Sequence, residues 1–224
     1  MKLCVVLFMI FSLGIFGEEK LNTLTEAEKK DGWKLLFDGK TAANWNNWNT
    51  KKPLKLGKWV VENGALTRKG QAFDIYTTEK FENFELVLEW KSKGNSGIFL
   101  RVDPSVKGPI YSVAPEMQIE NHAGQAHTTV AALYALVKVK GELVFHKDGW
   151  NKVRIRMENG KGTHWFNGKK IYEYQIGSDD WKAKVASSKF KNAKGYAQTA
   201  KGHIGLQEHG ADVAFRNIKI KVLK

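Results

Sequence analysis

The 224 residues are enough for one all-β domain with a full core, and an apolar content of 42% excludes a disordered chain. Thirty-six lysines and arginines against 23 acidic residues give a formal net charge of +13, which is typical of proteins that bind nucleic acids or other polyanions. The basic residues are spread over many segments without zinc-finger spacing or a nucleic-acid motif, so no nucleic-acid partner is expected.

The chain begins like an export signal. A short basic start at Met1-Lys2 precedes an apolar run over residues 3–16, which is too short to span a membrane comfortably. Cleavage after Gly17 would remove residues 1–17 and with them Cys4, the one cysteine, so disulfides and cysteine-based metal sites are not expected. We expect an exported protein, periplasmic or secreted, without a membrane anchor once the signal is cleaved.

Residues 18–31 read as a polar leader with at most one helical turn, and residues 32–224 as a single domain. Alternating apolar and polar residues, together with turn signals such as Asn-Gly, predict strands at 33–37, 58–62, 65–67, 84–90, 95–101, 115–122, 133–139, 142–145, 153–158, 163–166, 169–174, 203–208 and 211–223. A short helix is expected within residues 179–194. Many short strands and little helix predict one antiparallel sandwich or jelly roll.

Two of these strands carry unusual polar faces. Glu116, Gln118 and Glu120 alternate with Met117 and Ile119, so the three polar side chains share one face of a strand. In the same way Asn95, Gly97, Phe99 and Arg101 share one face of the strand at 95–101. The two faces either are exposed to solvent or together line one concave surface, and periodicity alone leaves both readings open.

The order of short motifs along the chain resembles the 3-keto-disaccharide hydrolase family. The motifs are GWKLLFDGK (32–40), NSGIFLR (95–101), EMQI (116–119), ALY (132–134), GWN (149–151), HWFNG (164–168), GLQEHG (205–210) and VAFRNI (213–218). The resemblance implies a concanavalin-A-like lectin/glucanase jelly roll, which is a sandwich of two curved antiparallel sheets with a sugar-binding concave face. The chain departs from the family pattern at Glu208, where aspartate is usual, and at Glu120-Asn121-His122, where Leu-Asp-Asn is usual.

The resemblance also implies cleavage of glycosides or disaccharides that a separate sugar dehydrogenase has already oxidised at C3. A ketone at C3 acidifies the C2 hydrogen, and loss of that proton lets the sugar expel its C1 substituent, after which water adds back. We assign Glu116 as the base and Arg101 as the cation that stabilises the enolate, with His209 and His164 as proton donors. The expected substrate-binding residues are Asn95, Gln118, Glu120, Tyr134, Gln207 and Trp48.

Two other functions remain open at this point. Glu116 and Glu120 resemble the paired carboxylates of a retaining endo-glucanase of the same fold, although Gln118 stands where such enzymes have aspartate. A non-catalytic carbohydrate-binding module is the second alternative, because a fold does not establish an activity. No histidine or carboxylate spacing typical of a metal site appears, and no cofactor is expected.

Overall fold

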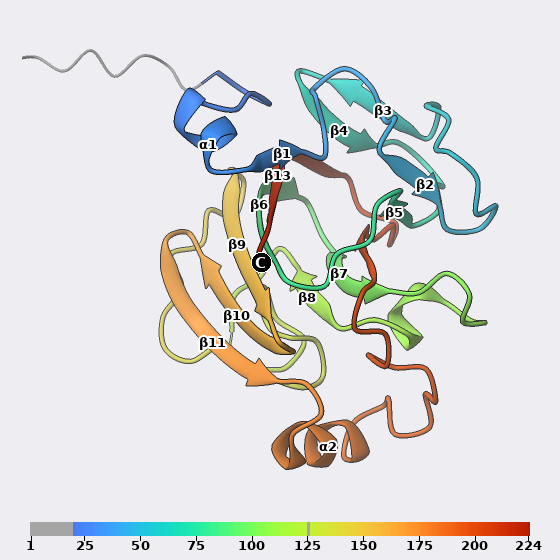
Figure 1. Ribbon diagram of the computed structural model, residues 1–224, viewed down its shortest axis with the longest axis vertical. Coiled ribbons are helices and arrows are strands. Elements are labelled where there is room, and N and C mark those ends of the chain that lie inside the picture. Colours follow the sequence, from blue (N-terminus) through green and yellow to red (C-terminus); the bar gives the residue numbers. More distant parts are fainter. Residues whose placement is uncertain (1–19, 125) are drawn as a thin grey trace, which may run out of the picture.

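The computed structural model describes residues 20–124 and 126–224, so the expected export signal at 1–17 lies outside the described residues. The described chain forms two antiparallel β-sheets packed face to face, with helices α1 (Glu26–Lys30) and α2 (Asp179–Ala186) at opposite ends (Figure 1). This arrangement confirms the predicted all-β sandwich. Neither those helices nor any other helix in the described ranges has the length and hydropathy that crossing a bilayer requires.

The larger sheet has eight strands within the described part of the chain, in the order β11-β10-β9-β6-β13-β4-β3, with β1 pairing to β13. Its strands are β1 (Trp33–Leu35), β3 (Trp59–Glu62), β4 (Ala65–Arg68), β6 (Phe84–Ser92), β9 (Asn151–Glu158), β10 (Lys161–Phe166), β11 (Lys169–Gln175) and β13 (Val213–Val222). The smaller sheet has the order β2-β5-β12-β7-β8. Its strands are β2 (Trp45–Asn47), β5 (Ile75–Thr77), β7 (Ser96–Val102), β8 (Glu116–Ile119) and β12 (His203–Leu206).

Three hairpins of the larger sheet turn at Asn-Gly pairs, as predicted. At Asn63-Gly64, Asn159-Gly160 and Asn167-Gly168 both residues have positive φ, between 45° and 85°. Asparagine and glycine tolerate this left-handed conformation, which matches the right-handed twist of the paired strands. The local sequence therefore determines the pairs β3-β4, β9-β10 and β10-β11.

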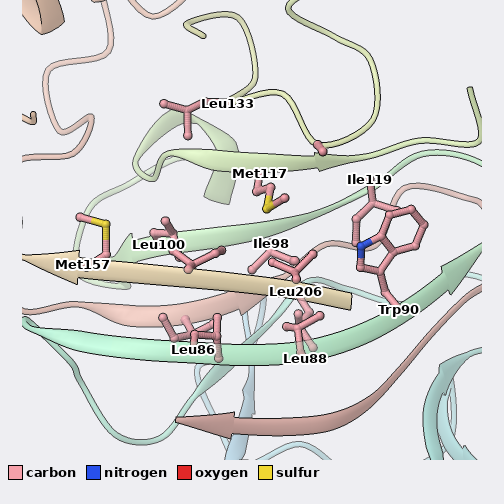
Figure 2. Close-up of a cluster of buried hydrophobic side chains, with 14 of the residues drawn as sticks. Leu86, Leu88, Trp90, Ile98, Leu100, Met117, Ile119, Leu133, Met157 and Leu206 are labelled. Atoms are coloured by element: carbon pink, nitrogen blue, oxygen red, sulfur yellow. The ribbon is translucent and has the colours of Figure 1, made fainter. Parts of the chain in front are cut away.

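The core fills the space between the two sheets. Figure 2 shows Leu86, Leu88 and Trp90 of the larger sheet facing side chains of β7, β8 and β12, among them Leu100 and Met117. All five of these side chains are at most 1% exposed. Burial of apolar surface on this scale is the main favourable contribution to folding, so one face of each sheet is fixed by it.

Residues 133–145 are not the hairpin that the sequence predicts. Ala131 and Ala135 have φ of 65° and 60°, which interrupts an extended strand. The segment instead runs beside β8, where Tyr134 N donates to Glu116 O over 2.9 Å and Gln118 N donates to Ala132 O over 2.9 Å. This irregular pairing covers the edge of the smaller sheet and brings Tyr134 beside Glu116.

The segment before β1 is fastened to the domain rather than loose. Thr25 and Glu28 form a capping box at the start of α1, which confirms the single helical turn expected there. Asn22 is 7% exposed and exchanges two hydrogen bonds with Asn217 of β13, over 2.7 and 2.9 Å. Lys219 of β13 also pairs with Glu28. Residues 20–31 therefore belong to the folded body.

Candidate functional site

The face of the smaller sheet that points away from the core is polar. In β8, Met117 and Ile119 join the core, so Glu116 and Gln118 lie on the opposite face. Phe99, which pairs with Glu116, belongs to a second apolar cluster on that opposite face, with Tyr76 among its members. This surface is called the outer face below, and it is where the unusual polar residues of the sequence gather.

One row of residues crosses the outer face from strand to strand. Trp48 N donates to Asp74 O over 2.8 Å, Gln207 N donates to Gly97 O over 2.9 Å, and Gly97 pairs with Gln118. Asp74 precedes Ile75 of β5 and Gln207 follows Leu206 of β12, and because Ile75 pairs with Leu206, the same register places Asp74 opposite Gln207. The row therefore runs in the order Trp48, Asp74, Gln207, Gly97 and Gln118.

Glu116 reaches into this row from the neighbouring position. A β-carbon built on Gly97 would lie 2.7 Å from Cγ of Glu116, so the glutamate side chain covers the glycine. Glu116 is 3% exposed, and its carboxyl group has no hydrogen bond or ion pair among the described residues. Burial raises the pKa of Glu116 to about 8; the positive charge of Lys189 opposes this shift and the carboxyl of Asp74 adds to it.

Other polar groups around Glu116 are also buried without partners. Oε1 of Gln118 and Oε1 of Gln207 lack hydrogen bonds, and these residues are 2% and 5% exposed. The Tyr196 hydroxyl is likewise unpaired, and its pKa is raised by burial, with contributions from Tyr174 and Glu116. Buried polar atoms without partners are uncommon, and such a concentration is expected where a polar ligand binds.

Asp74 forms the second acidic position of the outer face. Burial raises its pKa to about 7; the backbone N–H of Glu208, which donates to Oδ1 over 2.8 Å, opposes the rise, and the charge of Glu208 adds to it. Glu208 in turn pairs with Arg68 over 2.6 Å. The guanidinium of Arg68 is 6% exposed at its side chain and donates to the backbone oxygens of Gly210 and Ala211.

An ammonium group stands at the edge of the site. Nζ of Lys189 lies 4.1 Å from the ring centre of Tyr134, 5.0 Å from that of Tyr111 and 5.3 Å from that of Phe190. Aromatic faces attract cations, which holds the flexible lysine in place. Its charge lowers the pKa of Glu116, so it lies within electrostatic reach of that carboxyl.

Arg101 does not share the outer face, and the expectation that it lies beside Glu116 is wrong. Arg101 has a φ of 58°, and the pairing of β7 with β12 shifts register next to it. This bulge interrupts the alternation of sides on which the prediction rested. The guanidinium lies near Gly160 of the larger sheet, and burial lowers its pKa while Tyr174 and Glu82 oppose that shift. Its Nε has no hydrogen-bond partner.

His164 is likewise separated from Glu116, contrary to expectation. Its ring nitrogens lie 3.2 Å from the hydroxyl groups of Tyr172 and Tyr174, on the core side of the larger sheet. The residue is 0% exposed, and burial lowers its pKa to about 3. His164 is therefore a hydrogen-bonded residue of the core, although the sequence suggested a polar residue at the site.

The remaining predicted residues lie on or near the outer face. Gln118, Gln207 and Tyr134 surround Glu116, while Trp48 packs edge-on against Tyr76 and carries Lys51 at 3.0 Å from its ring centre. Three others lie outside the row. His209 is exposed beyond β12, Asn95 is half-buried before β7, and Glu120 follows β8, where its carboxylate accepts from Asn121 N. 

Asp74, Lys189 and Tyr196 were not identified from the sequence. Asp74 precedes β5, a three-residue strand too short for a periodicity signal. Lys189 reads as one of several solvated lysines after α2, and Tyr196 lies in an irregular segment. No local pattern marks them, because each reaches the site through tertiary packing. Among the described residues no group of three or more His, Cys, Asp or Glu side chains could hold a metal ion.

Comparison with known proteins finds relatives along most of the chain. The profile of the family described as 3-keto-alpha-glucoside-1,2-lyase-like domain matches residues 32–221. A Bacteroides thetaiotaomicron protein named 3-keto-disaccharide hydrolase is 32% identical over 231 aligned positions, covering 86% of this chain and 79% of that protein. Two Parabacteroides distasonis structures, both provisionally described as glycosyl hydrolases, have TM-scores of 0.83 and 0.68 at 31% and 29% identity. They cover 92% and 85% of this chain, and 100% and 99% of their own.

Proposed function

This chain belongs to the family of 3-keto-alpha-glucoside-1,2-lyase-like domains, which are carbohydrate-cleaving enzymes, and we propose that it cleaves glycosides oxidised to a ketone at C3. The single observation that carries the proposal is the buried and unpaired carboxyl of Glu116 on the outer face. A carbon acid such as C2–H needs a base stronger than an ordinary carboxylate. Burial supplies that strength by raising the pKa of Glu116 to about 8.

The groups around Glu116 suit the remaining demands of the reaction. Loss of the C2 proton places negative charge on the C3 oxygen, and hydrogen-bond donors or a cation near that oxygen stabilise it. The hydroxyl of Tyr196 is a nearby donor without a partner, and Lys189 supplies positive charge. The unpaired Oε1 atoms of Gln118 and Gln207 can accept hydrogen bonds from sugar hydroxyls. In this proposal Tyr196 and Lys189 replace Arg101, whose guanidinium lies near Gly160 in the turn between β9 and β10.

Collapse of the enolate then breaks the bond between C1 and the aglycone oxygen. The sugar leaves this step as an unsaturated ketone with a C1–C2 double bond, and addition of water to that bond completes a net hydrolysis. The substrate must come from an oxidoreductase that acts on the C3 hydroxyl of the sugar. The apolar run at residues 3–16 supports export of the protein to the periplasm or medium, where such a substrate would be met.

A direct test offers the protein 3-keto-trehalose, unoxidised trehalose and a mixed-linkage glucan, and measures released sugar. We expect release from the ketone alone, and exchange of its C2 hydrogen with deuterium oxide in the presence of protein. Glu116→Gln should abolish both signals, whereas Glu142→Gln, at an exposed position, should retain them. Release from the glucan without release from the ketone would instead favour a retaining glucanase that uses Glu116 and Glu120.

Mass spectrometry of the exported protein tests the export signal separately. A mature chain that begins at Glu18 would support it, and an intact Met1 in the exported fraction would refute it.

A further inference from the structure

The outer face holds a second acidic group, Asp74, in addition to Glu116. The elimination also needs a proton donor for the leaving oxygen, and no residue of the outer face has yet been assigned to that role. We propose that Asp74 donates the proton to the departing aglycone oxygen when the enolate formed by Glu116 collapses, an inference that rests on the proposed function. Departure of an alkoxide from a sugar is slow unless its oxygen is protonated as the bond breaks. The sequence suggested His164 and His209 for this step, but His164 is sealed in the core.

The spacing of the strands suits two groups working on neighbouring carbons of one sugar ring. Asp74 directly precedes β5, and Gly97 lies on β7; strand β12 runs between these two strands. Two strand spacings separate their Cα atoms by about 10 Å. The side chain of Glu116 lies over Gly97, and its pKa responds to Asp74, so the two carboxyl groups face a common space. A ring held above Gln207 would present C2 to one carboxyl and the C1 oxygen to the other.

The surroundings of Asp74 bring its titration close to neutral pH. Burial raises its pKa to about 7 and that of Glu116 to about 8. Because the two carboxyls interact, they titrate as a pair, and the pair holds one proton between these two values. Because Glu116 has the higher of the two pKa values, this proton lies mainly on Glu116, and the elimination proceeds from the minor arrangement in which Asp74 holds the proton and Glu116 is ionised.

A hydrogen bond and an ion pair behind it fix the orientation of the Asp74 carboxyl. The backbone N–H of Glu208 donates to Oδ1, and Glu208 is held by the buried Arg68. Among the described residues no hydrogen bond occupies Oδ2, so this oxygen is available to carry the proton. Arg68 and Glu208 act through Asp74 in this scheme and are positioning residues.

The step balances without another reactant. Glu116 takes the proton from C2, and the electrons of that bond form the enolate with its charge on the C3 oxygen. Collapse of the enolate restores the C3 carbonyl, forms the C1–C2 double bond and breaks the C1–O bond. The aglycone oxygen receives both bonding electrons and the proton of Asp74, so the aglycone leaves as a neutral alcohol. Glu116 ends protonated and Asp74 ionised, and exchange with water restores the starting state.

Leaving-group dependence tests this role in the full-length protein. Methyl 3-keto-α-glucoside has a poor leaving group, whereas 4-nitrophenyl 3-keto-α-glucoside has one that needs no proton. We expect Asp74→Asn to lower kcat/KM for the methyl glycoside about 100-fold or more and for the nitrophenyl glycoside only slightly. Glu116→Gln should lower both equally, and the exposed Asp148→Asn should lower neither.

Other outcomes would overturn the assignment. Equal losses on both substrates in Asp74→Asn, with an unchanged unfolding temperature, would reduce Asp74 to a structural role. Selective loss on the methyl glycoside in His209→Ala instead of Asp74→Asn would assign the proton donor to His209. Full activity of Glu116→Gln would refute the proposed function itself, which is a separate result from either of these.

Discussion

The side chain of Glu116 occupies the space that a side chain at Gly97 would need, with Cγ of the glutamate 2.7 Å from the place of the missing β-carbon. A glycine on β7 therefore determines where the carboxyl of β8 lies. In this position over Gly97 the side chain of Glu116 is buried, and burial raises its pKa.

Gly97→Ala should consequently displace the carboxyl of Glu116. We expect kcat/KM for a 3-keto glycoside to fall by about 100-fold, since a misplaced base loses much of its proton-transfer efficiency. Steady-state kinetics measure the loss, and circular dichroism checks the fold. Gly57→Ala is the matched control, because a β-carbon there meets nothing within 4 Å. An active Gly97→Ala protein would show that Glu116 need not lie over β7.

Glu116 should also make stability depend on pH. Its pKa is about 8 in the folded protein and 4.5 in its ordinary range, so between these values the folded state holds a proton that the unfolded chain has released. The free energy of unfolding should therefore fall as pH rises from 4.5 to 8, by on the order of 4 kcal/mol. Asp74 adds a loss of the same sign.

Denaturant unfolding of Glu116→Gln at pH 5 and pH 9 measures this contribution. The variant should be more stable than the unchanged protein at pH 9, because no charge is buried, and its stability should vary less with pH. A slope identical to that of the unchanged protein would contradict burial of the carboxyl.

His164 should have the opposite dependence. Burial lowers its pKa to about 3 from 6.5, so on acidification the unfolded chain takes up a proton that the folded protein refuses. The free energy of unfolding should fall as pH drops below 6.5, by at most about 1.4 kcal/mol per pH unit from this residue. In His164→Phe this slope should disappear, although the loss of the tyrosine contacts lowers stability at every pH. The exposed His127→Phe serves as the control, and its slope should match that of the unchanged protein.

The hydrogen bonds between Asn22 and Asn217 should fasten the N-terminal segment. Asn22→Ala removes the bond to Asn217 N and a further one to Gly64 O, leaving two half-buried backbone groups without partners. We expect the free energy of unfolding to decrease by about 2 kcal/mol. Thr23→Ala, which removes one exposed bond to Lys20 O, should change it far less. Comparable effects of the two substitutions would indicate that the segment contributes little.

The local sequence predicted correctly those features that depend on neighbouring residues in the chain. The Asn-Gly pairs predicted three hairpins, and alternation correctly divided β8 into a core side with Met117 and an outer side with Glu116. Residues 133–145 show the limit of this reasoning. Their apolar pattern fits strands, but Ala131 and Ala135 adopt left-handed backbone and the segment pairs irregularly with β8.

By itself, the sequence determined the all-β sandwich, the family resemblance and the outward position of Glu116 and Gln118, since each depends on neighbours in the chain or on motif order. Only the tertiary structure decided that Arg101 and His164 turn to the core and that Asp74 faces Glu116. A bulge reverses the side of Arg101, and strands far apart in the chain bring Asp74 into the row. Burial then raises both carboxyl pKa values, because the removal of water is a property of the assembled fold and not of any segment.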